Sequence, residues 1–291
     1  MDHKERALEH ERLSAKENEK LIKRHAINHG VFDNNGDLMT EIYKHKASIG
    51  LPGEAFGDEL STSVGPYGLY VTMQYLKELG EDVKDFYRFN RYGFRSEEFI
   101  KDHDGKHVVF AGCSNTSGEA MWEEYIWPRV LYNKISKDTK LSGYFNLGKS
   151  GATIKDCYDI LYNYIKRYGA PDVAFINLPA ASRDNFRGVP KIISLIKNHP
   201  DTKFIILTWD VTFSKEQAIP TDTRNAIPGI IQFSHTQMVY DIFDYEDSFP
   251  EGPRKKFLLK ALDDSHPGIA EQNCYAEMMY NSYYEYEKNK A

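Results

Sequence analysis

The stretch HVVFAGCSNTSG, residues 107–118, joins an apolar run to a glycine turn that carries a serine. The apolar run favours a buried strand, and Gly112 permits a tight turn directly after it. A helix is expected to begin within a few residues, close to Ser114. This order of strand, glycine turn and helix is typical of a parallel α/β sheet.

The same order repeats along the rest of the chain. The strand-like runs are HVVFAG (107–112), GYFNLG (143–148), DVAFINL (172–178) and KFIILTW (203–209). The helical patterns between and after them lie at 121–135, 152–169, 189–199, 235–247 and about 268–285. Nearly continuous apolar strands that alternate with helices predict a doubly wound, three-layer α/β fold with helices on both faces of a parallel sheet. Ligands are then expected at the carboxyl ends of the strands.

The first part of the chain has a different composition and lacks this alternation of strands and helices. Residues 1–25 are rich in charge with leucines at loosely helical spacing, which predicts an exposed helix or one that binds a protein partner. Residues 28–66 carry many turn signals around short apolar pieces. We therefore predict a helical and irregular extension at 1–86 and an α/β domain at 87–291.

The composition of the chain argues against several kinds of binding partner, location and site. The chain has 291 residues and a formal net charge of −6, which argues against a protein that mainly grips nucleic acid. Neither an apolar stretch of spanning length nor a secretory leader is present, so we expect no membrane association and a cytoplasmic location. The three cysteines form no CxxC pair, so we expect neither a disulfide framework nor a metal site.

Three loops at predicted strand ends carry reactive groups. Ser114 would face the cleft with free backbone N–H groups around it, although Ser114 or Thr116 could instead only cap a helix. In NLGKSGAT, residues 146–153, Gly151 could present a backbone N–H to the same cleft, or be only a turn residue. That loop lacks the GxxxxGK[ST] order of a phosphate loop, which argues against a nucleotide site.

The third loop is LDDSHPG, residues 262–268. An aspartate three residues before a histidine can accept from its Nδ1–H and leave Nε2 to take a proton from a serine. Asp263 and Asp264 are both candidates for the carboxylate, and the alternative is that they cap a helix while His266 lies on the surface.

Taken in order, GCSNTSG, NLGKSG and DDSH resemble the motifs of the GDSL/SGNH hydrolases. The segment at 87–99 also resembles a lead-in found in a GCS-type subgroup that includes phage-encoded proteins. The resemblance covers residues 87–281 and implies a flavodoxin-like fold. It implies Ser114 as nucleophile, His266 as base, Asp263 as the carboxylate, and the N–H groups of Ser114 and Gly151 as oxyanion donors, with no cofactor or metal.

Two departures from the family pattern stand out. Cys113 takes the place of the aspartate of GDS; it could be proposed as a thiol nucleophile, but a buried, inert thiol is the better expectation. No asparagine stands near Ala181, where the family's third block supplies one to the oxyanion hole. Ser182 or Arg183 could replace that donor, or Asn177 could reach in from the strand end.

The resemblance implies a serine esterase that removes small acyl groups, such as acetyl, from a carbohydrate. Two alternatives stay open at this point. One is a structural or binding protein on the same scaffold, such as a virion component, which the missing asparagine and the N-terminal extension favour. The other is an O-acyltransferase, in which a sugar hydroxyl replaces water. A virion-associated location is then an alternative to the cytoplasm.

Overall fold

The computed structural model describes residues 72, 75, 76, 79–81, 86–179, 183, 187–208, 230–232, 249–263 and 266–290. The chain divides into two units, residues 1–49 and 50–291, and every described residue lies in the second. The predicted helix at 1–25 and the helical pattern at 235–247 lie outside the described residues. The boundary predicted between residues 86 and 87 stays a prediction.

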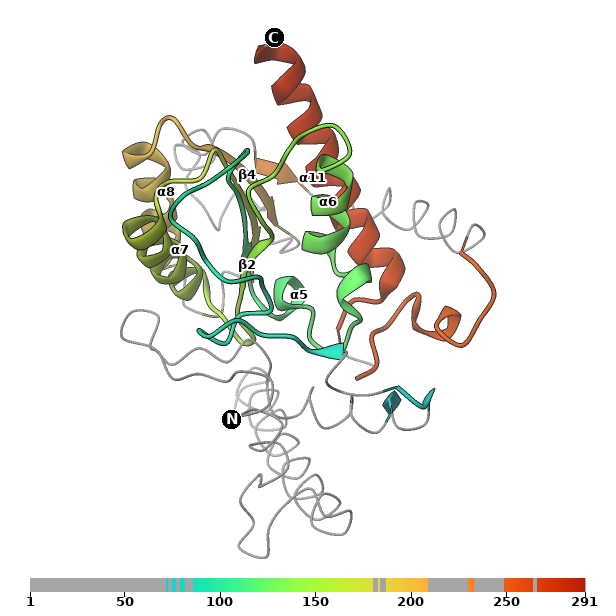
Figure 1. Cartoon of the computed structure of the whole chain (residues 1–291). Coiled ribbons are helices and arrows are strands. Elements are labelled where there is room, and N and C mark those ends of the chain that lie inside the picture. Colours follow the sequence, from blue (N-terminus) through green and yellow to red (C-terminus); the bar gives the residue numbers. More distant parts are fainter. Residues whose placement is uncertain are drawn as a thin grey trace, which may run out of the picture. The chain divides into compact units, whose positions relative to one another are not determined.

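A parallel sheet forms the centre of the described part (Figure 1). Its strands are β1 (Val108–Gly112), β2 (Phe145–Gly148), β3 (Val173–Leu178), β4 (Lys203–Thr208) and β5 (Ile230–Gln232). They pair in the order β2-β1-β3-β4-β5, and all four pairings are parallel. This is the flavodoxin-like order of doubly wound sheets, so the predicted fold class is confirmed.

Helices cover both faces of this sheet. They are α5 (Ser114–Ser117), α6 (Trp127–Ile135), α7 (Ile154–Tyr168), α8 (Val189–Asn198) and α11 (Ile269–Lys290), with 3-10 turns η1 (Glu123–Tyr125) and η4 (Lys255–Phe257). Figure 1 shows α7 and α8 on one side of the sheet and α6 and α11 on the other. Alternate strand residues fill the two cores: Ala174 and Ile176 pack with the α7 and α8 side, Val173 and Phe175 with the α6 and α11 side.

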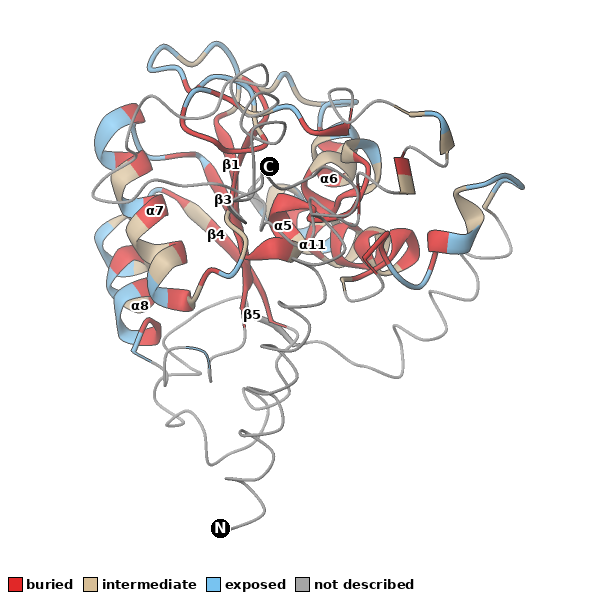
Figure 2. Cartoon of the chain, turned by 90° about the horizontal axis from the view of Figure 1, so that it is seen from below, coloured by how far each residue is buried: buried red, intermediate tan, exposed pale blue. Residues whose placement is uncertain are grey.

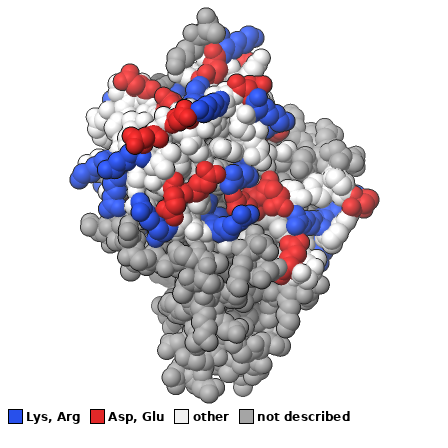
Figure 3. Space-filling view, viewed as in Figure 1, with Lys and Arg blue, Asp and Glu red and all other residues white. Residues whose placement is uncertain are grey.

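The burial pattern follows from these layers. In Figure 2 the strands β1, β3 and β4 are almost entirely buried, whereas α7 and α8 are buried only on the face turned to the sheet. Strands covered on both faces need apolar residues at every position, which explains the continuous apolar runs in the sequence. Figure 3 shows acidic and basic side chains interspersed on the face seen there. None of the helices in the described residues is long and apolar enough to cross a membrane.

Three elements differ from the prediction. The short strand β5 was not predicted, because the three residues IIQ are too few to show a period. The helix expected over 121–135 begins as the 3-10 turn η1 and becomes α6 only at Trp127, because Pro128 is tolerated only in the first turn of a helix. The last helix extends to Lys290 rather than ending near residue 285.

The register brings the strand ends together. Gly112 of β1 lies opposite Gly148 of β2 on one side and Asn177 of β3 on the other. β1 is therefore the strand from which the chain first turns toward one edge of the sheet and later toward the other. In open α/β sheets ligands bind at this switch point, outside the carboxyl ends of the strands.

Candidate active site

Ser114 is the first residue of α5, directly beyond the carboxyl end of β1. The residue before it, Cys113, is extended and occupies the N-cap position, with no side-chain cap hydrogen bond. The alternative in which Ser114 or Thr116 caps the helix is therefore wrong. Gly112 is required here, because a Cβ atom at this position would lie 2.0 Å from Thr116 Oγ1 and 2.7 Å from the Asn177 carbonyl oxygen.

The short helix α5 is fixed on the end of β2. Asn146 Nδ2 donates to the Thr116 carbonyl at 2.8 Å, from the middle of the strand. A Cβ atom at Gly148 would lie 2.3 Å from the Ser117 backbone nitrogen, so only glycine allows the helix to approach this closely. These contacts hold Ser114 at one place, with 5% of its surface exposed.

Two backbone N–H groups near Ser114 are available to an anion. Within the described residues, the N–H groups of Ser114 and Gly151 donate no hydrogen bond. The turn that carries Gly151 is tied to β1, since Lys149 N donates to the Gly112 carbonyl at 3.1 Å. Gly151 has a φ of +70° with open space around it, so glycine is favoured by its backbone conformation rather than by crowding.

The start of α7 fixes the other end of this turn. Thr153 caps the helix and accepts from Asp156 N at 3.1 Å, while Asp156 Oδ2 accepts from Thr153 N at 2.8 Å. This reciprocal capping box holds the first turn of α7 directly after Gly151.

His266 lies against Asp263 in the loop before α11. Its Nδ1 atom is 2.5 Å from Asp263 Oδ2, and its backbone N–H donates to Asp263 Oδ1 at 3.1 Å. Asp263 is buried, so its carboxylate holds the imidazole in one orientation. Asp264 lies outside the described residues, and the contact seen here is made by Asp263.

The pKa of His266 reflects this pairing. Burial disfavours the charged imidazolium and lowers the pKa, but the hydrogen bond to Asp263 and the negative charges of Asp263 and Glu119 outweigh it. The pKa therefore lies above its usual value, which is the direction expected of a base with a carboxylate partner.

Hydrogen bonds connect the histidine loop and the following helix α11 to the segment around α5. Leu262 N donates to the Ala120 carbonyl at 3.0 Å, just beyond α5. Gln272 of α11 donates through Nε2 to the Asn115 carbonyl at 3.2 Å and accepts from Trp127 N at 2.9 Å. Within the described residues no hydrogen bond joins Ser114 Oγ to His266 Nε2. Such contacts are often looser without substrate, and the catalytic roles of both residues stay a prediction.

Glu119 is a site residue that the sequence analysis missed. It follows α5, is only 6% exposed, and places Oε2 3.8 Å from His266 Nε2. The Ser150 hydroxyl donates a hydrogen bond to the same oxygen. A carboxylate in a loop already assigned to the cleft was the available signal, because the strand-end loops of such a sheet share one edge.

The residues that could replace the missing asparagine as an oxyanion donor lie in different places. Arg183 donates through Nη1 to the Ala152 carbonyl at 3.2 Å, beside Gly151, whereas Ala181 and Ser182 lie outside the described residues. Asn177 is fully buried in β3, and its side-chain amide has no hydrogen-bond partner within the described residues. Cys113 is also buried and packs with Ala152 and Cys157.

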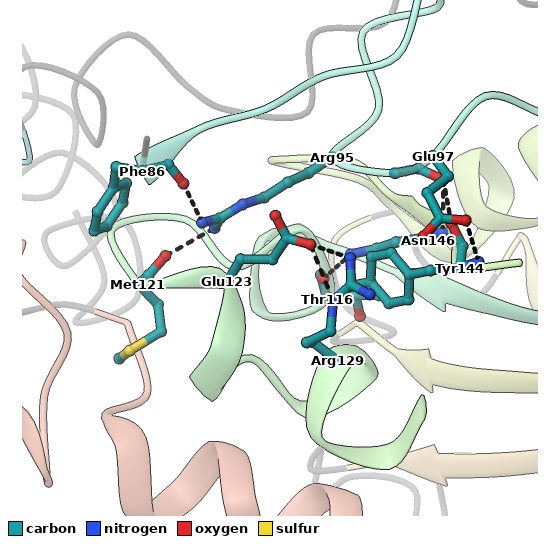
Figure 4. Close-up of polar contacts among 10 residues, drawn as sticks. Phe86, Arg95, Glu97, Thr116, Met121, Glu123, Arg129, Tyr144 and Asn146 are labelled. Carbon is teal, nitrogen blue, oxygen red and sulfur yellow. Dashed lines mark hydrogen bonds and ion pairs between the residues drawn. The ribbon is translucent and has the colours of Figure 1, made fainter. Parts of the chain in front are cut away.

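The buried guanidinium of Arg95 supports the turn after α5. It donates to the carbonyl oxygens of Gly118 at 2.7 Å, Met121 at 2.8 Å and Phe86 at 2.6 Å. Figure 4 shows Arg95 extending between Phe86 and Met121, with the Arg129 and Glu123 pair nearby. This turn carries Glu119 and receives the bond from Leu262, so Arg95 helps to position both loops.

We expect Arg95→Met to lower the free energy of unfolding by about 3–5 kcal/mol, because buried carbonyl groups would lose their donors. Urea unfolding measures the change. The control is Arg88→Met, an exposed arginine nearby, which should change stability by no more than about 0.5 kcal/mol. A loss for Arg95→Met no larger than that of the control would contradict the role given to Arg95.

Comparison with known proteins finds distant likenesses. No protein-family model and no curated protein matches the chain. Among solved structures it is similar to the psychrotrophic esterase EstA from Pseudoalteromonas sp., in a structure inhibited by monoethylphosphonate. The TM-score is 0.43 and the identity 16%, over 62% of this chain and 98% of that one. It is also similar to a member of the lipolytic protein G-D-S-L family from Veillonella parvula, with a TM-score of 0.36 and 12% identity over 61% and 96% of the two chains. Because the sequence identities and TM-scores are this low, the chemistry of the site has to be inferred from its own residues.

Proposed function

We propose that the chain is a serine-dependent ester hydrolase of the GDSL/SGNH type, in which Ser114, His266 and Asp263 form the catalytic triad. The observation that carries the proposal is the Asp263–His266 hydrogen bond. The loop that contains this pair is hydrogen-bonded, through Leu262 N and the Ala120 carbonyl, to the turn that follows the Ser114 helix. Membership of the GCS-type subgroup, with its phage-encoded proteins, is part of this proposal.

The reaction begins with attack of Ser114 Oγ on the ester carbonyl carbon. The Oγ–C bond forms, the Oγ proton moves to His266 Nε2, and the carbonyl π electrons move to oxygen. The N–H groups of Ser114 and Gly151 are aimed at that oxygen in the proposal, with Arg183 or Ser182 as a further donor. Asp263 stabilises the imidazolium that forms.

The second half of the reaction releases the products. The tetrahedral intermediate collapses, the C–O bond to the alcohol breaks, and Nε2–H protonates the leaving oxygen. Water then attacks the acyl-serine, giving its proton to Nε2, and the Oγ–C bond breaks to free the acid. No step requires a group beyond these side chains, backbone amides and water.

We further propose that the substrate carries a small acyl group, such as acetyl, on a carbohydrate. The groups around the histidine support a polar alcohol, because Glu119, Ser150 and Arg183 can all bond to hydroxyl groups. The same chemistry would make an O-acyltransferase if a sugar hydroxyl entered in place of water.

The test is to follow acetate release from p-nitrophenyl acetate and from a panel of acetylated sugars. We expect a burst of p-nitrophenolate, accumulation of acetyl on the Ser114 peptide, and faster release from acetylated sugars than from long-chain esters. Transfer of acetyl to an added sugar, with no release to water, would show a transferase. Absence of both release and transfer with folded protein would contradict the proposed function.

A further inference from the structure

Glu119 is a buried carboxylate that the reaction above does not use. Its own N–H donates to the Ser114 carbonyl at 3.1 Å, and its Oε2 accepts from the Ser150 hydroxyl. Burying a carboxylate is costly unless hydrogen bonds or a positive charge compensate. Glu119 therefore places a negative charge inside the site, on the Nε2 side of the histidine ring.

The His266 ring lies between two carboxylates. Asp263 Oδ2 is 2.5 Å from Nδ1, and Glu119 Oε2 is 3.8 Å from Nε2. Because Asp263 and Glu119 come from different loops, negative charge faces the ring at both of its nitrogen atoms. We propose that Glu119 is a positioning residue that acts through His266, because its charge on the Nε2 side of the ring stabilises the imidazolium together with Asp263.

A role for Glu119 in catalysis rests on the proposed function, in which His266 is the base. When the serine proton moves to Nε2, the positive charge forms beside Glu119 as well as Asp263, and both stabilise it. Among the described residues, the charged groups that act on the ring are Asp263 from its own loop, Glu119 from the turn after α5, and Arg183 from the loop after β3, whose positive charge opposes the other two.

The negative charge of Glu119 also affects His266 before the reaction begins. A carboxylate near Nε2 favours the imidazolium, and protonated histidine cannot accept a proton from Ser114. The raised pKa of His266 means that the fraction of usable base falls as the pH falls through that pKa. Removing the charge of Glu119 should therefore lower the pKa and extend the use of His266 as a base to lower pH.

The test is an NMR titration of the His266 ring in the full chain, for wild type and for Glu119→Gln. The signal is assigned by its loss in His266→Asn. Loss of an opposite charge within about 4–6 Å should lower the pKa by about one pH unit. The matched control is Glu124→Gln, which removes an exposed carboxylate that pairs with Arg254 instead, and should leave the His266 pKa unchanged.

A second variant keeps the test decisive if Glu119→Gln does not fold. Glu119→Asp keeps the charge but withdraws it by one methylene, so it should lower the pKa by less than the full removal. An unchanged His266 pKa in a folded Glu119 variant would overturn the inference, because the charge of Glu119 would then not act on the ring.

Serine labelling separates this inference from the proposed function. The rate of fluorophosphonate labelling of Ser114 should follow the same titration, with its acid limb about one pH unit lower in Glu119→Gln. If no protein is labelled but the NMR pKa shifts, the esterase proposal fails and the coupling of Glu119 to His266 stands. If wild type is labelled and the pKa does not shift, the esterase proposal stands and the role of Glu119 fails.

Discussion

Ser114→Ala is expected to lower kcat/KM for ester hydrolysis by about 10⁴ to 10⁶-fold, because it removes the atom that bonds to the acyl group in the proposed mechanism. The turnover that persists would come from the backbone donors and substrate binding. Steady-state kinetics on p-nitrophenyl acetate measures the loss.

The control for Ser114 is Ser117→Ala on the same short helix. Ser117 is also buried, and its hydroxyl donates to the Ser114 carbonyl at 3.1 Å, so its removal disturbs α5 without removing the nucleophile. We expect Ser117→Ala to keep most of the activity, within about tenfold of wild type. Equal losses in the two variants would mean that the fold of α5, rather than the Ser114 hydroxyl, limits the reaction.

Asp263→Asn is expected to lower kcat by about 10⁴-fold with little change of the fold. The amide can donate to Nδ1, which favours the tautomer with its proton on Nε2, and that tautomer cannot accept a proton from Ser114. The amide also lacks the charge that stabilises the imidazolium. Single-turnover acylation, measured as p-nitrophenolate release, isolates the affected step.

The neighbouring carboxylate provides the matched control for Asp263. Asp264→Asn removes the same charge one residue further along and is expected to cause only a small loss of rate. The reverse order of losses would assign the carboxylate role to Asp264 instead.

The parts of the fold that repeat could be predicted from the sequence. The runs that became β1, β2, β3 and β4 are apolar at nearly every position, because helices cover both faces of the sheet. The positions of Ser114 and Gly151 followed from the same rule, since the loop after each parallel strand reaches one edge of the sheet.

The parts that depend on single contacts could not be predicted. Arg95 is fully buried, although arginine is usually exposed, and its role depends on three carbonyl groups that no sequence period marks. In the sequence, Glu119 is one more acidic residue in a loop. Its place near His266 depends on how the histidine loop packs in the folded chain. The short strand β5 has its place because β4 offers a parallel partner, and not because its own three residues require it.

The central claim is that Ser114 is an activated nucleophile, and covalent labelling tests it most directly. Wild type and Ser114→Ala are treated with a fluorophosphonate, and intact mass with peptide mapping locates any adduct. The account predicts one adduct on wild type, located on Ser114, and none on the variant. A folded wild-type protein that stays unlabelled, or an adduct on another residue, would contradict it and would favour a binding or structural protein on this scaffold.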